Sequence, residues 1–254
     1  MTRPERSRSF GAAAEDYDRL RPAPVPAALR WLLPSSEVTV LDLGAGTGLV
    51  SRSLAAAGVA DVVAVEPDDA MRAVLAARSP GARALAGTAE DIPLPDASVD
   101  AVLASSAWHW FDPDRATAEV ARVLRPGGVL GLLWSFADPA TDWVAELRHL
   151  QRADDAGNED STSGVRAGFA IDLPDGAPFG AGSSEVFRRR TWMAADDVAA
   201  MLGTYSTVLT LRPEERAEVR RAAREVIARR VGTDPVRVPF ATAVWRATRL
   251  ASDI

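Results

Sequence analysis

Cysteine and lysine are absent from the chain of 254 residues, and only two histidines occur. Without cysteine, the protein has no disulfide, no thiolate nucleophile and no cysteine-based metal site. Without lysine, it has no amine for a Schiff base and no P-loop lysine for nucleotide phosphates. These absences exclude pyridoxal enzymes and P-loop nucleotide hydrolases, and they leave His109 and His149 as the only imidazole groups.

The charge balance is 29 basic against 35 acidic residues, which gives a formal net charge of −6. Because this balance provides no overall positive field, we expect a small molecule as the partner and no nucleic acid. The sequence has no run of about 18 apolar residues and no apolar signal core at its N-terminus. We therefore expect a cytoplasmic protein that does not enter a membrane. Nothing in the pattern predicts an oligomeric state.

A short apolar run, residues 38–43, stops abruptly at three glycines, Gly44, Gly46 and Gly48. The run is typical of a buried parallel strand. The alanine- and leucine-rich segment 49–57 that follows is typical of a helix. A strand, a glycine turn and a helix place unsatisfied backbone N–H groups at the carboxyl end of a sheet, where a ligand can approach the main chain closely. The pattern predicts a cofactor site.

The glycine spacing disfavours a nicotinamide dinucleotide as the ligand. A dinucleotide fingerprint would place its third glycine at position 49, which is leucine here. A second apolar run, residues 61–65, leads into Glu66, which lies about 20 residues beyond the glycines, where a carboxylate can accept hydrogen bonds from both hydroxyls of a ribose. Together these features indicate a ligand that contains a nucleoside.

Residues 41–48, with the sequence LDLGAGTG, resemble the first motif of the class I S-adenosylmethionine-dependent methyltransferases, and Glu66 resembles their ribose-binding acid. The resemblance covers residues 9–134 well and the remainder loosely. It implies an α/β fold: a doubly wound, mostly parallel seven-stranded sheet whose last strand is antiparallel, with helical cap elements. It also implies S-adenosyl-L-methionine as cofactor and S-adenosyl-L-homocysteine as product.

The same resemblance implies which residues bind this cofactor. Asp42 is expected to orient the turn or the amino group of the cofactor, and residues 88–90 are expected to flank its adenine. The commoner family version has aspartate at position 88, so Thr88, Glu90 or the backbone near Ala89 must serve here. The expected set is Tyr17, Arg21, Asp42, Gly44, Ala45, Gly46, Gly48, Glu66, Pro67, Met71, Thr88, Ala89, Glu90 and Ser105.

A dense aromatic cluster with a histidine, residues 107–111, follows an expected strand at 98–105. It falls where open α/β sheets build their ligand crevice, and similar methyltransferases carry a His-Trp pair there. Trp108 and Trp110 can shield the reacting centre from water or attract a sulfonium cation. His109 can deprotonate a nucleophile near neutral pH and is the candidate catalytic base. The alternative is that these aromatic residues only fill the hydrophobic core.

The beginning of the chain resembles a narrower group. Phe10, Tyr17, Arg21 and Pro22 resemble the start of the small-acid methyltransferases that include trans-aconitate methyltransferase, in which the N-terminal segment closes over the cofactor. The alternative is that Phe10 and Tyr17, which share one helical face, only fix this helix to the domain.

We predict a single methyltransferase domain over residues 1–254, with a helical lid at 1–33 and a cap or substrate-recognition insertion at 137–184. The predicted substrate residues are Trp108, His109, Trp110, Trp143 and Tyr205. We predict no metal site, because the acidic cluster at 154–160 has neither a histidine nor a repeating Asp-x-Asp pattern.

The predicted function is S-adenosylmethionine-dependent methylation of a small molecule, at a carboxylate, hydroxyl or carbon acid of a small acid or natural product. A carboxylate is already ionised near neutral pH, so only a hydroxyl or carbon acid would need a base. Two alternatives stay open. One is a homologue that binds the cofactor but catalyses another rearrangement or acts as a binding module, and the other is an NAD(P)-dependent oxidoreductase.

Overall fold

The computed structural model describes residues 14–151 and 171–251, which form parts of two compact units. We call the larger one the core unit; its described residues are 23–135, 171–187 and 242–251. The second is the helical unit, with described residues 14–22, 136–151 and 188–241. Phe10 and residues 152–170 of the predicted insertion at 137–184 lie outside the described residues, and the predicted single domain with its lid and insertion stays a prediction.

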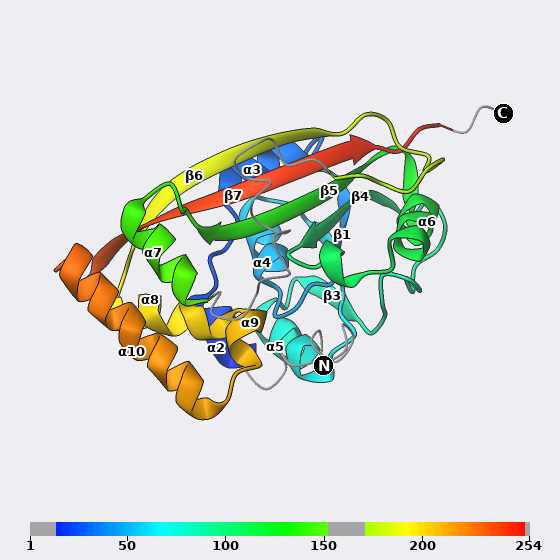
Figure 1. Ribbon diagram of the computed structural model, residues 1–254. Coiled ribbons are helices and arrows are strands. Elements are labelled where there is room, and N and C mark those ends of the chain that lie inside the picture. Colours follow the sequence, from blue (N-terminus) through cyan, green and yellow to red (C-terminus); the bar gives the residue numbers. More distant parts are fainter. Residues whose placement is uncertain (1–13, 152–170, 252–254) are drawn as a thin grey trace. The chain divides into compact units, whose positions relative to one another are not determined.

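The strands form a seven-stranded sheet in the order β3-β2-β1-β4-β5-β7-β6 (Figure 1). Each neighbouring pair from β3 to β5 is parallel. This order places the topological switch between β1 and β4, and ligands of open α/β sheets bind at the carboxyl ends of the strands there. The strands are β1 Thr39–Leu43, β2 Asp61–Val65, β3 Ala82–Leu85, β4 Val99–Ser105, β5 Leu124–Ala137, β6 Ser183–Met193 and β7 Val236–Thr248.

Strand β7 runs antiparallel to β5. The Gly127 N–H donates to the Arg249 carbonyl (3.0 Å), and the Asp138 N–H donates to the Pro239 carbonyl (2.9 Å), so positions rise along β5 as they fall along β7. The antiparallel last strand and the strand order confirm the predicted fold class.

Four helices of the core unit alternate with its strands, namely α3 Pro26–Leu32, α4 Leu49–Ala56, α5 Asp69–Arg78 and α6 Pro113–Val123. Two begin at aspartates that the sequence marks as helix starts. Asp68 accepts a hydrogen bond from the Met71 N–H (2.9 Å), and Asp112 accepts one from the Arg115 N–H (3.1 Å). These N-caps satisfy donors that the first helical turn leaves unpaired.

The hydrophobic core of the core unit packs α3 and α4 against the sheet. Leu29 and Leu32 of α3, Leu54 of α4 and Leu103 of β4 are all fully buried in one cluster. The apolar strand residues are therefore covered by helices, as in a doubly wound fold.

The helical unit has a separate apolar cluster. Its helices are α2 Ala14–Leu20, α7 Asp142–Leu150, α8 Ala195–Met201, α9 Ser206–Leu209 and α10 Pro213–Arg230, and α10 runs alongside α7 and α8 (Figure 1). Ion pairs reinforce this packing. Glu146 of α7 pairs with Arg229 and with Arg230 (2.8 Å), while Asp196 of α8 pairs with Arg224 (2.6 Å).

Two elements include glycine-containing segments. β5 begins at Leu124, before the glycines at 127 and 128, because these two glycines exchange backbone hydrogen bonds with Arg249. Residues 203–207 take part in a 3₁₀ turn at Leu202–Thr204 and in α9.

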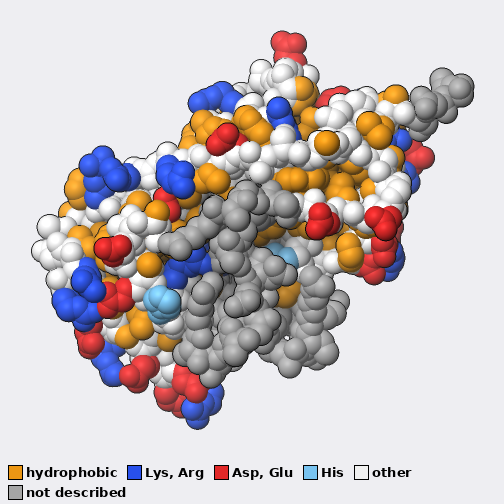
Figure 2. Space-filling view, turned by 45° about the horizontal axis from the view of Figure 1, so that its top comes forward, with side chains coloured by type: hydrophobic (Ala, Val, Ile, Leu, Met, Phe, Trp, Pro, Cys, Tyr) orange, Lys and Arg blue, Asp and Glu red, His pale blue; other side chains and the backbone are white. Residues whose placement is uncertain are grey.

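Within the described residues, no helix is both long enough and apolar enough to cross a membrane. Acidic and basic side chains are interspersed on the face shown in Figure 2, so neither sign of charge dominates that face. The cellular location and the absence of a nucleic-acid partner stay predictions.

Replacing Leu54 with alanine tests the core directly. Leu54 is fully buried, so we expect Leu54→Ala to lower the free energy of unfolding by about 2–5 kcal/mol in urea titrations followed by circular dichroism. The control is Leu250→Ala in the same unit, because Leu250 is 52% exposed; its effect should stay within about 0.5 kcal/mol. Equal losses in the two variants would contradict the packing described here.

Candidate active site

The turn between β1 and α4 is fastened to the end of β2. The N–H groups of Gly44 and Ala45 both donate to the Val65 carbonyl (2.9 and 3.1 Å). The Gly48 N–H donates back to the Ala45 carbonyl (2.9 Å), which closes the turn. Main-chain hydrogen bonds therefore close the predicted turn and tie it to the end of β2.

The glycines of the turn serve different purposes. A Cβ on Gly48 would lie 2.6 Å from the Ser79 hydroxyl and 3.1 Å from Leu75 Cγ, so glycine is needed for close packing of α5. Gly46 also has a positive φ, +58°, but no atom lies within 4 Å of the place where its Cβ would be. Of these two, Gly46 is the glycine that leaves open space beside exposed main chain, as a ligand site requires.

Glu66 joins this turn to the end of β2. One carboxylate oxygen accepts a hydrogen bond from the Gly46 N–H (2.8 Å), and the other accepts one from the Asp68 N–H (2.9 Å). The residue is 7% exposed, and burial raises the pKa of its carboxyl group. A carboxylate oxygen can accept more than one hydrogen bond, so both oxygens keep acceptor capacity for the hydroxyls of a ribose.

Asp42 lies fully buried beneath the turn. Its Oδ2 accepts hydrogen bonds from the Ser51 N–H (3.0 Å) and the Ser51 hydroxyl (2.7 Å), which fastens the first turn of α4. Its Oδ1 is buried and has no hydrogen-bond partner in the described structure. Burial raises the pKa of Asp42 to about 6, and the nearby Glu66 charge adds to the shift. Ser51 is a site residue that sequence reasoning missed, although a serine in the first turn of a helix is a recognisable signal.

In the predicted adenine segment, residues 88–90, one side chain forms a hydrogen bond within the protein. The Glu90 carboxylate accepts a hydrogen bond from the Asp112 N–H (2.9 Å), at the start of α6. Thr88 is exposed and forms a short antiparallel bridge with Asp91, whereas Ala89 is buried. One Glu90 oxygen is thus engaged, and Thr88, the backbone near Ala89 and the second Glu90 oxygen stay the predicted contacts with adenine.

The aromatic cluster packs beside the turn. Trp108–Trp110 form a 3₁₀ helix directly after β4, and none of its three residues is fully buried. A Cβ on Gly44 would lie 2.9 Å from Ala107 Cβ and 3.1 Å from Phe111 Cζ, so the two ends of the aromatic segment contact the first glycine of the turn. Within the core unit, the structure thus brings together the glycine turn, Glu66 and the aromatic cluster.

The geometry of this cluster is specific. The rings of Trp108 and Phe111 meet edge to face at 5.8 Å, and those of His109 and Trp110 are 4.6 Å apart. Ser106, just before the cluster, has φ of +51°, a left-handed conformation that is uncommon for residues other than glycine. Such backbone strain often accompanies functional sites.

Four other predicted residues lie in the helical unit. The Arg21 guanidinium lies over the rings of Tyr17 (5.0 Å) and Tyr205 (3.9 Å), and its Nη2 donates to the Thr204 carbonyl (3.0 Å). Trp143 packs against the apolar cluster of this unit. Their predicted roles in binding cofactor or substrate stay predictions.

The remaining predicted residues border the core-unit site in different ways. Pro67 is exposed after Glu66, Met71 is buried in the first turns of α5, and Ser105 ends β4. Over residues 14–151 and 171–251, no three or more histidine, aspartate or glutamate side chains are grouped so as to hold a metal ion.

A family model described as a methyltransferase domain matches residues 41–132, the stretch that holds the turn, Glu66 and the aromatic cluster. The solved structure of a protein from Anaeromyxobacter dehalogenans, described as a type II methyltransferase, is 30% identical with a TM-score of 0.70; the match covers 90% of this chain and 97% of that one. The chain belongs to the methyltransferase family. Membership confirms the predicted cofactor, S-adenosylmethionine.

Two relatives add detail to the comparison. An uncharacterized methyltransferase of Mycobacterium tuberculosis is 54% identical over 149 residues, which are 59% of this chain and 61% of that protein. A malonyl-[acyl-carrier protein] O-methyltransferase of Methylococcus capsulatus is 39% identical over 158 residues, 58% of this chain and 56% of that protein. The matched part of this methyltransferase thus spans 61% and 56% of the two relatives.

The residues at the turn fit this cofactor. Gly46 leaves open space beside its main chain, and Glu66 retains acceptor capacity next to it. The buried Oδ1 of Asp42 has no hydrogen-bond partner in the described structure and can accept from a cationic or N–H donor.

The raised pKa of Asp42 predicts a pH-dependent stability. Between the ordinary value of 3.8 and about 6, the native chain holds more protons at this position than the unfolded chain, so the free energy of unfolding falls as pH rises. Asp42→Asn removes this dependence. Between pH 5 and pH 7, the free energy of unfolding of the variant should rise by about 1 kcal/mol relative to that of the wild type.

Urea titrations at several pH values check this expectation. Asp69→Asn is the control for loss of a negative charge, because the Asp69 side chain is 91% exposed. A difference between Asp42→Asn and wild type that stays constant from pH 5 to pH 7 would show that Asp42 does not titrate in this window.

Proposed function

We propose that the protein transfers the methyl group of S-adenosylmethionine to a carboxylate, hydroxyl or carbon acid of a small molecule. The observation that carries the proposal is the hydrogen bond from the Gly46 N–H to the Glu66 carboxylate (2.8 Å) beside the open face of the turn. It sets an acceptor for ribose hydroxyls next to main chain that a ligand can approach.

In this proposal, different residues of the site bind different parts of the cofactor. Glu66 accepts hydrogen bonds from the ribose, Asp42 holds the turn through Ser51 and offers its Oδ1 to the amino group, and Thr88 with the backbone at Ala89 borders the adenine. When bound, the cofactor supplies an electrophilic methyl group on a sulfonium. The chain's own contribution is alignment, because positioning alone supplies much of the acceleration of such a displacement.

The aromatic cluster forms the reaction side of the site. Trp108 and Trp110, partly exposed at the end of β4, keep water from the reacting centre and present ring faces that attract a cation. His109 is beside the ring of Trp110 (4.6 Å), where an imidazole can take a proton from a hydroxyl or carbon acid.

For the acceptor, we propose a carboxylic acid. Support comes from the 39% identity with a malonyl-[acyl-carrier protein] O-methyltransferase, since the oxygen open to methylation in a malonyl thioester belongs to a free carboxylate. A carboxylate is ionised near neutral pH, so this reaction requires no base. Malonyl-pantetheine is therefore the first acceptor to assay. A phenol is the comparison, because its methylation would need a base.

Gly46→Arg tests the cofactor site, since the arginine side chain would fill the open face of the turn. We expect calorimetric titration of the wild type to show binding of S-adenosylhomocysteine but not of NADH, and Gly46→Arg to abolish the binding. Gly58→Arg is the matched control, because Gly58 also has a positive φ (+89°) and open space around its Cβ position.

The outcomes separate the candidate functions. Binding of NADH alone would support the oxidoreductase alternative. Binding of S-adenosylhomocysteine without methylation of any acceptor would favour a homologue that catalyses another reaction or serves as a binding module. Undiminished affinity in a folded Gly46→Arg variant would remove the turn from the site.

His109→Ala tests the base. With a phenolic acceptor we expect kcat to fall by about 10²–10⁴-fold, whereas with malonyl-pantetheine it should fall far less. Affinity for S-adenosylhomocysteine should change by less than about threefold, because the change removes no cofactor contact proposed here. The control is His149→Ala, which changes the exposed second histidine, on α7. Unchanged rates with both acceptors would eliminate the base role.

A further inference from the structure

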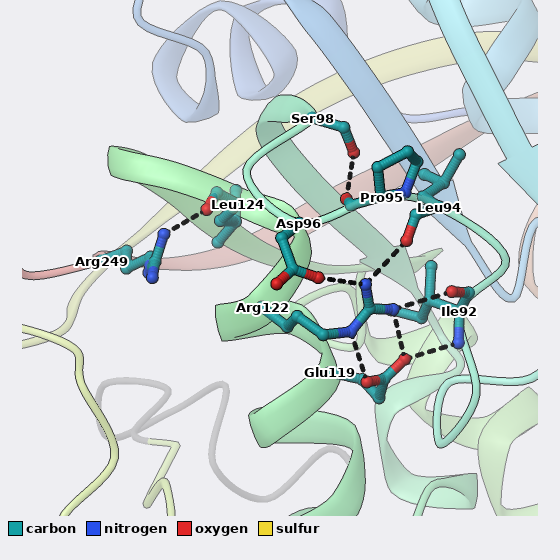
Figure 3. Close-up of polar contacts among 9 residues, drawn as sticks. All are labelled: Ile92, Leu94, Pro95, Asp96, Ser98, Glu119, Arg122, Leu124 and Arg249. Carbon is teal, nitrogen blue, oxygen red and sulfur yellow. Dashed lines mark hydrogen bonds and ion pairs between the residues drawn. The ribbon is translucent and has the colours of Figure 1, made fainter.

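We infer that Arg122, on α6, is a positioning residue for adenine recognition, because its guanidinium holds the loop that carries residues 88–90. The inference rests on the proposed function, in which this loop borders the adenine. It concerns only contacts within the core unit, and Figure 3 draws the residues that form hydrogen bonds with Arg122.

Five hydrogen bonds extend from the guanidinium of Arg122 to its surroundings. Its Nη1 donates to the Leu94 carbonyl (2.7 Å) and to Asp96 Oδ1 (2.9 Å). Its Nη2 donates to the Ile92 carbonyl (2.9 Å) and to Glu119 Oε2 (2.7 Å), while Nε donates to Glu119 Oε1 (2.7 Å). A guanidinium has five N–H groups, so this number of contacts matches its full donor capacity. In Figure 3 the loop carbonyls and the Glu119 carboxylate converge on this one group.

Glu119 completes the clamp. Besides binding Arg122 with both oxygens, it accepts a hydrogen bond from the Ile92 N–H through Oε2 (2.8 Å). The side chains of Arg122 and Glu119 are 30% and 21% exposed, so water competes only partly for these bonds. The neighbouring Arg122 guanidinium lowers the pKa of the Glu119 carboxyl, which therefore stays ionised near neutral pH.

The loop needs this donor group because of its own composition. Pro93 and Pro95 have no N–H, so the loop cannot form a regular ladder of backbone hydrogen bonds. The carbonyls of Ile92 and Leu94 instead receive charge-assisted hydrogen bonds from Arg122, which are stronger than neutral ones. Lysine, which lacks a planar fork, cannot reproduce these contacts with the loop and Glu119 at once.

Packing connects the clamped part of the loop with the adenine segment. A Cβ on Gly87 would lie 2.6 Å from Pro93 Cδ and 3.2 Å from Val65 Cγ1, so Pro93 packs on the start of the segment, beside the end of β2. Thr88 and Asp91 are bridged across the turn between them. A shift of Pro93 would therefore displace residues 87–91, next to the strand that leads into Glu66.

Because residue 88 is threonine, adenine recognition is sensitive to the position of the loop that carries residues 88–90. Threonine at 88 has no carboxylate to accept from the adenine amino group, and the Glu90 carboxylate is engaged with Asp112. The Thr88 hydroxyl and the backbone groups near Ala89 are then the adenine contacts that depend most on the position of the loop. A flexible side chain can adjust to a displaced ligand, whereas a backbone group has the direction that the loop gives it.

Arg122→Ala is the decisive variant, and adenine discrimination is the decisive measurement. Calorimetry would compare affinities for S-adenosylhomocysteine and S-inosylhomocysteine, in which oxygen replaces the adenine amino group. We expect the wild type to prefer S-adenosylhomocysteine, and Arg122→Ala to lose about tenfold in its affinity and most of the preference, since hydrogen bonds to charged groups contribute enough for such a loss. Arg122→Lys should not restore the preference.

The matched control is Arg125→Ala. Arg125 forms an ion pair with Asp100 (2.7 Å) in the same unit and, in the described structure, no hydrogen bond or ion pair with residues 88–96, so its loss should leave the preference unchanged. If Arg122→Ala fails to fold, Glu119→Gln weakens the clamp while keeping the shape, and it should reduce the preference by a few-fold.

Two results would overturn the inference. The first is a folded Arg122→Ala variant with the wild-type preference for adenine. The second is an equal loss of affinity for both ligands together with a lower melting temperature, since this would make Arg122 only a structural residue. If the wild type binds neither ligand, the proposed function itself fails and the inference fails with it.

Discussion

The hydrogen bond between the Gly46 N–H and the Glu66 carboxylate is the contact on which the candidate site depends. It links the turn after β1 to the end of β2, and Asp68 holds the second carboxylate oxygen from the other side. A carboxylate that is only 7% exposed requires such donors, because an unpaired buried charge would be very costly. Glu66 thus fixes the shape of the turn with the same oxygens that face a ribose in the proposed function.

Most of the fold could be predicted from the sequence because its signals are local. The apolar run at 61–65 is β2, residue for residue, and Asp68 and Asp112 mark helix starts by capping N–H groups three residues ahead. The glycine turn was also recognisable, since its spacing and the position of Glu66 together resemble a family motif. Features that depend on neighbours within about four residues can be inferred from their pattern alone.

The parts that could not be predicted depend on partners far along the chain. The strand character of residues 124–128 comes from pairing with Arg249, and the Arg21 guanidinium is placed by Tyr205. The hydrogen bond from the Asp112 N–H to Glu90 joins residues 22 positions apart, so the pattern around residue 90 does not predict it. Even the roles of the glycines in the motif could not be distinguished from the sequence. Gly48 is needed for packing because Ser79 lies against it, whereas Gly46 has open space beside it.

The site can also be located without any motif, from features of the structure that lower its stability. Asp42 and Glu66 are buried carboxyl groups whose pKa values burial raises, and both lie at the end of neighbouring parallel strands. Ser106 adopts a left-handed backbone conformation at the end of β4, the next strand in the sheet. Sequences optimised only for folding avoid buried carboxyl groups of this kind, so the presence of two of them at one edge of the sheet indicates selection for something other than stability. Because this edge is also the topological switch between β1 and β4, energetics and topology independently favour the same place for the chemistry.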